Sequence, residues 1–223
     1  MLAIVGGTSL LDCPLPPFKA CRVSTPFGPA SVLAGDDFLL LLRHGNGRPP
    51  HRINHRANLA ALALLGADRI VLVGSTGSLR AEHAPGSLLV PTDYATTSLV
   101  PTIHDRAIVH VCPGFSNALS RRLAALVPGA HHGGVYVQTP GPRLETQAEV
   151  HSLATYADVV GMTCASEAAL ANELELEVAA LCTVENYANG LDTCPVSFEA
   201  IVEAARSNAD RMAGIVQRLV EEL

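Results

Sequence analysis

Short runs of strand-forming residues, separated by segments with helical spacing, constrain the fold of this chain more than any other feature. Two of the runs are apolar at every position, which is typical of strands buried on both faces of a parallel sheet. Strands that alternate with helices predict an α/β fold, with a central mixed or mostly parallel twisted sheet flanked by helices. The runs are residues 2–5, 38–42, 69–73, 87–91, 135–137, 158–161 and 178–184.

The segments between these runs contain the predicted helices. Ser197 is a candidate N-cap for one long amphipathic helix that closes the chain. We interpret His51 and His55 as surface or cap residues. Residues 74–78 are predicted to form a loop, and residues 93–113 an irregular polar segment. Helices are predicted over residues 59–65, 115–127, 146–156, 165–174 and 198–220.

The composition excludes several classes of function. A net charge of -6 gives no basic surface for nucleic acid or an anionic membrane. No window approaches about twenty apolar residues, and the N-terminus lacks the regions of a signal peptide. The six cysteines form no C-x-x-C pair and no metal-ligand spacing. We therefore expect a cytoplasmic protein with free thiols, no metal and a single domain over residues 1–223.

Three strand ends carry residues that can bind an anion. They are residues 6–9 (Gly-Gly-Thr-Ser), residues 43–45 (Arg-His-Gly) and the Gly/Ser/Thr stretch 74–78. Glycines let backbone N–H groups approach an anion, hydroxyls donate to it, and a guanidinium offers a planar bidentate fork. Neighbouring parallel strands end at one edge of a sheet, so these groups could converge on one small oxyanion. A plain turn after the first strand, and an Arg43 paired with a surface carboxylate, are the alternatives.

Segment 138–149 is the strongest candidate for a ligand loop. A strand ends and a helix begins inside it, and two prolines flank Gly141, which can adopt dihedral angles closed to other residues. A stiff loop at the carboxyl end of a strand is suited to hold Arg143, Leu144 and Glu145 at a ligand crevice. A turn with solvated charges is the alternative interpretation.

Several short motifs follow one another in a characteristic order. They are Gly6-Gly7-Thr8, Arg43-His44-Gly45, Gly77-Ser78-Leu79, Gly141-Pro142-Arg143 with Glu145-Thr146 and Ala148-Glu149, Val160-Gly161-Met162-Thr163, and the strand into Asn186. Together, over about residues 3–205, they resemble the trimeric purine nucleoside phosphorylases and 5'-methylthioadenosine phosphorylases, and most closely 5'-methylthioinosine phosphorylases. The resemblance implies a nucleoside phosphorylase-like fold, inorganic phosphate as co-substrate and no cofactor. It also implies a homotrimer, or a dimer of trimers, with active sites at the interfaces.

Carried over residue by residue, the resemblance implies a role for each matching position. Arg43 and His44 would hold the attacking phosphate and Asn186 would bind the departing base, so these are the candidate catalytic residues. Met162 would pack on the ribose, and segment 93–113 would supply part of a neighbour's site. The implied phosphate ligands are Thr8, Arg43, His44, Ser75 and Thr163, and the implied substrate contacts are Leu144, Glu145, Met162, Asn186 and Phe198.

The chemistry of N-glycosidic cleavage agrees with these roles. Cleavage develops positive charge on the ribose and negative charge on the purine, so an anion beneath C1' and a donor at the base lower the barrier. Phosphate itself attacks C1', so no covalent nucleophile is needed. The chain accordingly has no serine nucleophile elbow and no Cys/His motif.

The matching residues also predict which nucleoside is bound. A glutamate at 145 can accept from N1–H of a 6-oxopurine, while Asn186 donates to O6 and accepts from N7–H. Members that act on 6-aminopurines tend to have aspartate at the second position and a small residue at the first. Phe198 replaces a histidine that binds the 5'-hydroxyl, and an apolar side chain favours a methylthio or deoxy group. The resemblance therefore favours 6-oxopurine nucleosides, with 5'-methylthioinosine as a good substrate.

Other functions remain open at this point. Within the family, 5'-methylthioadenosine phosphorylase and inosine/guanosine phosphorylase are alternatives. A nucleoside hydrolase would use water, which needs no anion cradle such as Arg43-His44. A purine-binding module without turnover is the alternative outside enzymes, and Phe198 is alternatively a core residue of the closing helix. Gly74 stands where the methylthioadenosine enzymes have a threonine, and Glu185 beside the base-reading position has no assigned role.

Overall fold

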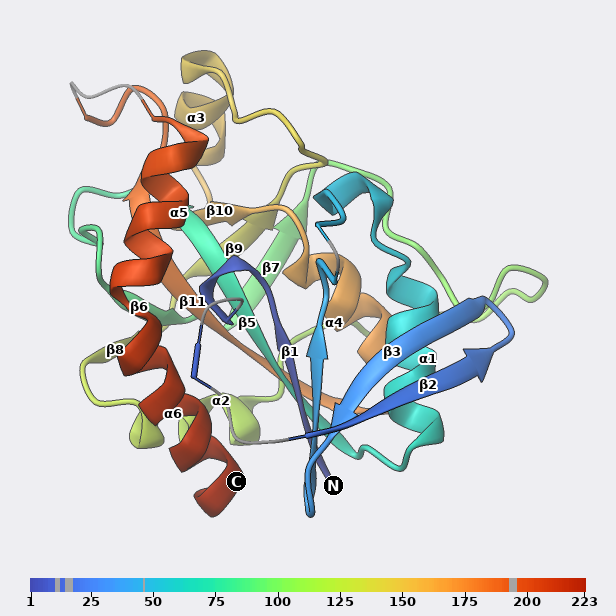
Figure 1. The fold of residues 1–223 in the computed structure, drawn as a ribbon. Coiled ribbons are helices and arrows are strands. Elements are labelled where there is room, and N and C mark those ends of the chain that lie inside the picture. Colours follow the sequence, from blue (N-terminus) through green and yellow to red (C-terminus); the bar gives the residue numbers. More distant parts are fainter. Residues whose placement is uncertain (11–12, 15–17, 46, 193–195) are drawn as a thin grey trace.

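The computed structural model of the protein describes residues 1–10, 13–14, 18–45, 47–192 and 196–223 (Figure 1). Within these residues one mixed sheet runs through the molecule and helices flank it. The strands are β1 (Leu2–Gly6), β2 (Lys19–Thr25), β3 (Gly28–Ala34), β4 (Phe38–Leu42), β5 (Arg69–Ser78), β6 (Leu88–Val90), β7 (Asp93–Thr96), β8 (Ala130–His132), β9 (Val135–Gln138), β10 (Val159–Gly161) and β11 (Glu177–Tyr187). The predicted α/β fold is therefore confirmed.

The helices lie between these strands and at the end of the chain. The 3-10 turn η1 (Thr8–Leu10) follows β1, and the 3-10 turn η2 (Pro50–Arg52) precedes the first α-helix. The α-helices are α1 (His55–Leu64), α2 (Asn117–Leu126), α3 (Gln147–Leu153), α4 (Cys164–Glu173), α5 (Phe198–Ser207) and α6 (Ala209–Glu222). Among the described residues, no helix combines the length and the apolar character that crossing a membrane requires.

The centre of the sheet is parallel, and it brings the predicted strand ends together. β1 lies between β4 and β5 and runs parallel to both, with Gly6 opposite Leu42 and Val73. β11 continues the parallel order on the other side of β5. The sheet path is β2-β3-β4-β1-β5-β10-β9-β7, while β11 pairs with β5 and β6, and β6 with β8. Residues that follow β1 and β4 therefore lie at the same edge.

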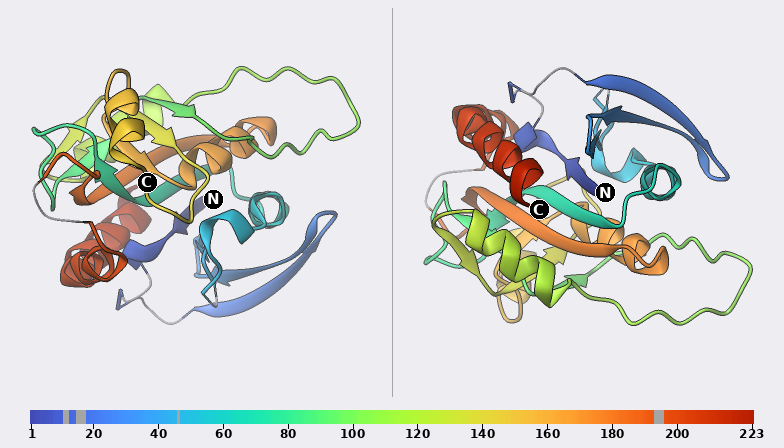
Figure 2. Two further views of the ribbon diagram at one scale, coloured as in Figure 1. Left: turned by 90° about the horizontal axis from the view of Figure 1, so that it is seen from above. Right: turned by 90° about the horizontal axis from the view of Figure 1, so that it is seen from below.

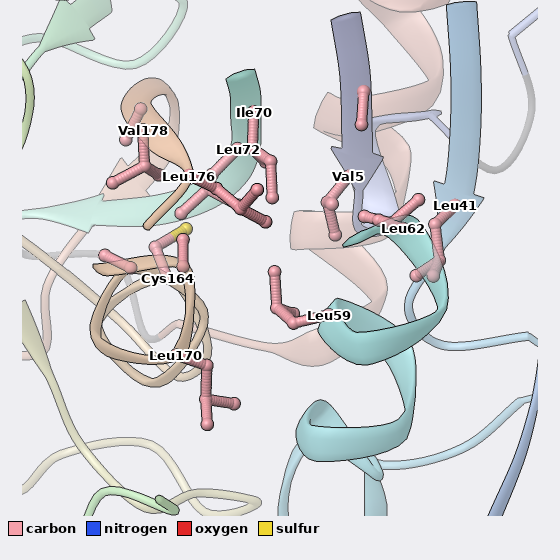
Figure 3. Packing of buried hydrophobic residues seen from close by; sticks show 14 of the residues in the cluster. Val5, Leu41, Leu59, Leu62, Ile70, Leu72, Cys164, Leu170, Leu176 and Val178 are labelled. Atoms are coloured by element: carbon pink, nitrogen blue, oxygen red, sulfur yellow. The ribbon is translucent and has the colours of Figure 1, made fainter. Parts of the chain in front are cut away.

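Helices cover both faces of this central sheet, and each face has its own apolar core. Residues of α1 and α4 pack on one face, as Figures 2 and 3 show. Leu62 of α1 lies beside Val5, Leu59 points from α1 toward α4, and Leu170 and Cys164 of α4 belong to the same cluster (Figure 3). Residues of α2 and α6 pack on the other face. The strands are buried on both faces, as the continuous apolar runs predicted.

Several predicted element boundaries differ from the structure. Residues 74–78 form no loop, because β11 and β10 pair with them and extend β5 to Ser78. The closing helix is divided at Asn208, whose side-chain Nδ2 donates to Ala204 O at 3.0 Å and ends α5, while the apolar stripe resumes in α6. The irregular segment 93–113 begins with β7, which pairs with β9. The hairpin of β2 and β3 was not predicted.

Candidate active site

A cavity of about 620 Å³ opens at the carboxyl edge of β1 and β4. Every residue that the resemblance assigned to phosphate or substrate lines it: Thr8, Arg43, His44, Ser75, Leu144, Glu145, Met162, Thr163, Asn186 and Phe198. Arg143, which was also expected at the crevice, does not line it; its exposed guanidinium donates to Glu149 instead. The volume is within the range of about 300 to 1,000 Å³ that is typical of small-molecule sites. The structure thus places these residues, which come from distant parts of the sequence, around one space.

Arg43 lies at the inner end of the cavity and is almost completely buried. Its Nε and Nη2 donate to the two carboxylate oxygens of Glu167 at 2.7 and 2.9 Å, and its remaining donors reach Val73 O and Val5 O. Burial alone would lower the pKa of Arg43, but the Glu167 carboxylate raises it above the usual value. The bidentate fork expected for phosphate is therefore occupied by Glu167. Of the five N–H groups, one on Nη1 has no partner among the described residues.

Glu167 has a second basic neighbour. His55 was interpreted as a surface or cap residue, but it is buried at the start of α1, and its Nδ1 lies 3.5 Å from Glu167 Oε1. This distance is too long for a good hydrogen bond and counts as an electrostatic contact. Burial alone would raise the pKa of Glu167, but Arg43 and His55 lower it below its usual value. The cap itself is Asn54, which accepts from Ala57 N–H.

His44 lies beside Arg43, and its ring orientation is fixed by the backbone. Its Nδ1 is 2.8 Å from Arg48 O, and Arg48 N–H donates back to His44 O. A carbonyl oxygen can only accept, so Nδ1 carries a proton. Burial lowers the pKa of His44 below its usual value. In the neutral imidazole Nε2 then carries a lone pair, so His44 is an acceptor at that atom.

The hydroxyl of Ser75 belongs to a buried polar group behind the cavity. Ser75 Oγ accepts from Ser9 N–H at 3.2 Å and lies within reach of the Glu185 carboxyl. Glu185 Oε1 accepts from Thr183 Oγ1 at 2.5 Å, whereas Oε2 is buried without a hydrogen-bond partner among the described residues. Burial raises the pKa of Glu185, and the hydroxyls of Thr183 and Ser75 oppose this only in part.

A bulge in β11 explains why Glu185 and Asn186 differ. The register between β11 and β5 shifts between Val184 and Asn186, so Glu185 is the extra residue. Bulges re-aim neighbouring side chains. Here Glu185 stays buried while Asn186 lines the cavity opposite Gly77. Asn186 Nδ2 donates to Tyr187 O at 2.7 Å, which leaves Oδ1 without a partner among the described residues.

Side chains of β9 hold the beginning of α4. Tyr136 Oη accepts from the backbone N–H groups of Thr163 and Cys164 at 3.1 and 3.2 Å. Gln138 accepts from Ser166 N–H and donates to its hydroxyl. These contacts use the backbone donors that a helix N-terminus would otherwise offer to an anion. The Thr163 N–H is therefore engaged, so its hydroxyl is the group of this cavity-lining residue that could bind an anion.

Glu145 is held on one side only. Its side chain is buried, and Oε1 accepts from Thr139 Oγ1 at 2.5 Å. Asn189 fixes the backbone by donating to Glu145 O at 3.1 Å. Oε2 has no partner among the described residues, and Glu145 lines the cavity. The arrangement leaves one carboxylate oxygen for a donor on a ligand.

Helix α5 forms a largely apolar wall of the cavity, which Arg206 also lines. Phe198 is the first residue of α5, and 68% of its surface is exposed. Ile201 and Val202 line the same wall. The interpretation of Phe198 as a core residue is wrong, since it lies outside the buried clusters.

Sequence reasoning missed Glu167, Tyr136 and Thr139. None contacts the cavity as a ligand residue would, but each holds a residue that does. Glu167 carried a signal that could have been used, because it is an acidic residue in the first turn of an otherwise apolar, buried helix. A fully buried carboxylate needs a partner.

Comparison with known proteins identifies the family of the chain. A family model described as the phosphorylase superfamily matches residues 2–221. A probable 6-oxopurine nucleoside phosphorylase of Archaeoglobus fulgidus is 40% identical, over 100% of this chain and 97% of that protein. A probable S-methyl-5'-thioinosine phosphorylase of Methanocaldococcus jannaschii is 34% identical, over 99% and 92% respectively.

A solved structure of a phosphorylase has the same fold as this chain. It is a mutant of the adenosine/methylthioadenosine phosphorylase from Schistosoma mansoni in complex with methylthioadenosine. The two structures superimpose with a TM-score of 0.88 at 25% identity, covering 99% of this chain and 90% of that one. With the matched family model and the full-length relatives, this chain belongs to the phosphorylase superfamily.

Proposed function

We propose that this protein is a purine nucleoside phosphorylase that acts on 6-oxopurine nucleosides, with 5'-methylthioinosine favoured. A phosphate oxygen forms a bond to C1', the C1'–N9 bond breaks, and its electron pair goes to the purine, which takes up a proton. The products are the free base and a ribose 1-phosphate, 5-deoxy-5-methylthio when the substrate carries that group. The observation that carries the proposal is the single cavity lined by every predicted phosphate and substrate residue.

The inner end of the cavity suits the attacking phosphate. Arg43, His44, Thr8 and Thr163 supply charge, hydroxyls and an imidazole around one point, and Ser75 adjoins them. Because the contacts behind Arg43 fix it before any ligand arrives, these groups need little reorganisation during the reaction.

The middle of the cavity suits a 6-oxopurine. The free carboxylate oxygen of Glu145 can accept from N1–H, while Asn186 can donate to O6 and accept from N7–H as the base departs. A 6-aminopurine presents an acceptor at N1, which would face the carboxylate and leave buried groups unpaired. The names of the relatives from Archaeoglobus and Methanocaldococcus, with 6-oxopurine and thioinosine substrates, support this assignment.

The outer, apolar end suits a 5' substituent without a hydroxyl. Phe198, Ile201 and Val202 offer hydrocarbon surface and no hydrogen-bond group. A methylthio group buried there gains apolar contact, whereas a 5'-hydroxyl would lose its contact with water.

We also propose that the protein assembles as a homotrimer. The segment 97–114 leaves the body of the molecule as an arm, drawn green in Figure 2. Leu99 and Ile108 on it are 99% and 91% exposed, and exposed apolar residues on a projecting segment mark a contact surface. Light scattering should give about three times 23.3 kDa, or six times that value for a dimer of trimers. The double variant Leu99→Ser with Ile108→Ser should reduce the assembly. A wild-type protein that is already monomeric, with no change of mass in the double variant, would contradict the proposed trimer.

Product analysis tests the reaction class. Inosine and inorganic phosphate are incubated with the protein, and phosphorus NMR follows the phosphate. A new sugar 1-phosphate signal in equal amount to the hypoxanthine released supports a phosphorylase. Free ribose with unchanged phosphate would identify a hydrolase, and no release with any 6-oxopurine nucleoside would identify a binding module. We propose that the protein works in the reducing environment of the cytoplasm, where thiols such as Cys21, Cys112, Cys164 and Cys182 stay unoxidised, so the assay contains a thiol reductant.

A further inference from the structure

The phosphate end of the cavity contains an acceptor as well as donors. His44 donates through Nδ1 to Arg48 O at 2.8 Å, so in the neutral ring the cavity-lining side chain has its lone pair at Nε2. An acceptor is unfavourable beside a fully deprotonated oxygen of an anion, because two lone pairs would face each other. It is favourable beside an oxygen that carries a hydrogen.

A donor lies next to this acceptor. A Cβ built on Gly7 would be 2.4 Å from Arg43 Nη1 and 3.6 Å from His44 Nε2, so the two nitrogens flank the same point. The glycine leaves this corner open, and any larger residue would close it. Arg43 Nη1 has one N–H without a partner among the described residues. The corner thus pairs one donor with one acceptor.

We propose that this corner recognises whether the bound anion carries a hydrogen on one of its oxygens. Arg43 donates to a charged oxygen of hydrogen phosphate, and His44 Nε2 accepts from its P–OH group. The site then prefers tetrahedral dianions that carry one hydroxyl, phosphate and arsenate, over those that carry none. The inference rests on the proposed function, because it assigns the anion of the same reaction.

The charges around His44 support a neutral ring. Burial has the largest effect and disfavours a positive charge on His44, as do Arg43 beside it in the sequence and His55 at the start of α1. Glu167 on α4 favours that charge, but its carboxylate is already paired with Arg43. The hydrogen bond to Arg48 O also favours the charged ring, but burial outweighs it, and the pKa of His44 is lowered. The acceptor state therefore dominates at neutral and alkaline pH.

Monofluorophosphate provides a sharp probe. At about pH 8 it has the charge and shape of hydrogen phosphate, with fluorine in place of the hydroxyl. Sulfate is a second probe without a hydrogen. Both are measured as inhibitors competing with phosphate in the release of hypoxanthine from inosine, and arsenate is measured as an alternative co-substrate.

We expect monofluorophosphate and sulfate to bind at least about tenfold more weakly than phosphate, as for one lost hydrogen bond. Arsenate should replace phosphate with a KM within about threefold, a difference of well under 1 kcal/mol. Sulfate inhibition should strengthen as the pH falls through the lowered pKa of His44, since protonation converts Nε2 into a donor. Sulfate keeps one charge state over this range, so the trend reports on the protein.

Variants identify the residue responsible. In His44→Gln the amide can turn either its oxygen or its NH2 toward the anion, so discrimination should collapse to within about threefold and lose its pH dependence. His132→Gln is the matched control, because His132 is an exposed residue of β8 away from the cavity; it should keep the wild-type ratio.

The outcomes separate this inference from the proposed function. Equal binding of phosphate, monofluorophosphate and sulfate at about pH 8 would overturn the inference while phosphate-dependent cleavage stood. Discrimination that persists in His44→Gln would overturn it as well. Absence of any phosphate-dependent cleavage would instead remove the proposed function. If His44→Gln lowers turnover too far for kinetics, calorimetry of the three anions with the variant gives the same comparison.

Discussion

The two ends of the cavity are built in opposite ways. At the phosphate end Arg43 is 3% exposed, and its guanidinium makes hydrogen bonds to Glu167, Val5 and Val73. At the 5' end Phe198 is 68% exposed and stands at the first turn of α5. Arg43 is thus buried within the isolated chain, whereas Phe198 would become buried only against a ligand or a neighbouring subunit.

This difference separates stability from specificity. The buried ion pair of Arg43 and Glu167 fixes the geometry in which phosphate is proposed to be oriented, so changes there should cost folding energy as well as activity. An exposed apolar wall contributes little to folding, so changes there should alter substrate preference alone. Glu145 and Asn186, the proposed base-binding residues, lie between these extremes, since the side chain of each makes a hydrogen bond to one neighbour.

The largest effect is expected for Glu167→Gln. It leaves the buried Arg43 charge uncompensated and should lower the free energy of unfolding by about 3 to 5 kcal/mol. Urea denaturation measures this loss, with Glu221→Gln on the exposed side of α6 as a control expected to change by less than about 0.5 kcal/mol. If Glu167→Gln and Glu221→Gln had equal free energies of unfolding, the buried ion pair would not stabilise the inner end of the cavity as claimed.

A companion variant distinguishes folding from phosphate binding. Replacing both partners, Arg43→Met with Glu167→Met, removes both buried charges and should recover most of the stability. It should not recover the apparent affinity for phosphate. Recovery of both would mean that Arg43 has a purely structural role.

The next effect concerns the base. Asn186→Asp should shift the ratio of kcat/KM values for 6-oxopurine and 6-aminopurine nucleosides toward the latter by about ten- to a hundredfold. A carboxylate can accept from both N7–H and a 6-amino group, whereas it repels O6. Unfolding should hardly change, because Asn186 makes one hydrogen bond to a backbone carbonyl. An unaltered substrate ratio would contradict the assigned role.

A smaller shift is expected at the open end. Phe198→His offers a partner for a 5'-hydroxyl and removes apolar contact with a methylthio group, so inosine should gain on 5'-methylthioinosine by about threefold to tenfold in kcat/KM. The melting temperature should stay close to that of the wild type. If the variant instead loses stability without a change in preference, Phe198 serves an interface rather than the substrate.

The smallest effect is a pH trend at Glu185. Burial raises its pKa, so the folded state holds this proton more tightly than the unfolded state. Stability should therefore fall as pH rises from the ordinary glutamate value through the raised one. The glutamine of Glu185→Gln has no proton that titrates in this range, so the melting temperature of the variant should fall less as the pH rises. Parallel pH profiles for variant and wild type would show that Glu185 is not the source.

The sequence predicted most of the parts that are local. A run such as residues 38–42 followed by Arg43 and His44 can be read without knowing what lies beside it in space. The resemblance added the remaining site residues, and the structure gathers all of them around one cavity.

The predictions that failed concern residues whose structure depends on neighbours distant in the sequence. Nothing in residues 74–78 shows that β10 and β11 will pair with them and keep them extended. Glu167 lies 124 residues from Arg43, and a local pattern cannot show which buried acid takes the guanidinium fork. His55 was misplaced for the same reason, since its burial comes from contact with α4.

The most direct test is a panel of initial rates. Purine release is measured from inosine, guanosine, 5'-methylthioinosine and 5'-methylthioadenosine, each with and without phosphate. The structure predicts release that requires phosphate, is fastest relative to KM with 5'-methylthioinosine, and is slower with the 6-aminopurine. Release without phosphate would contradict the reaction class, and release led by 5'-methylthioadenosine would contradict the roles given to Glu145 and Asn186.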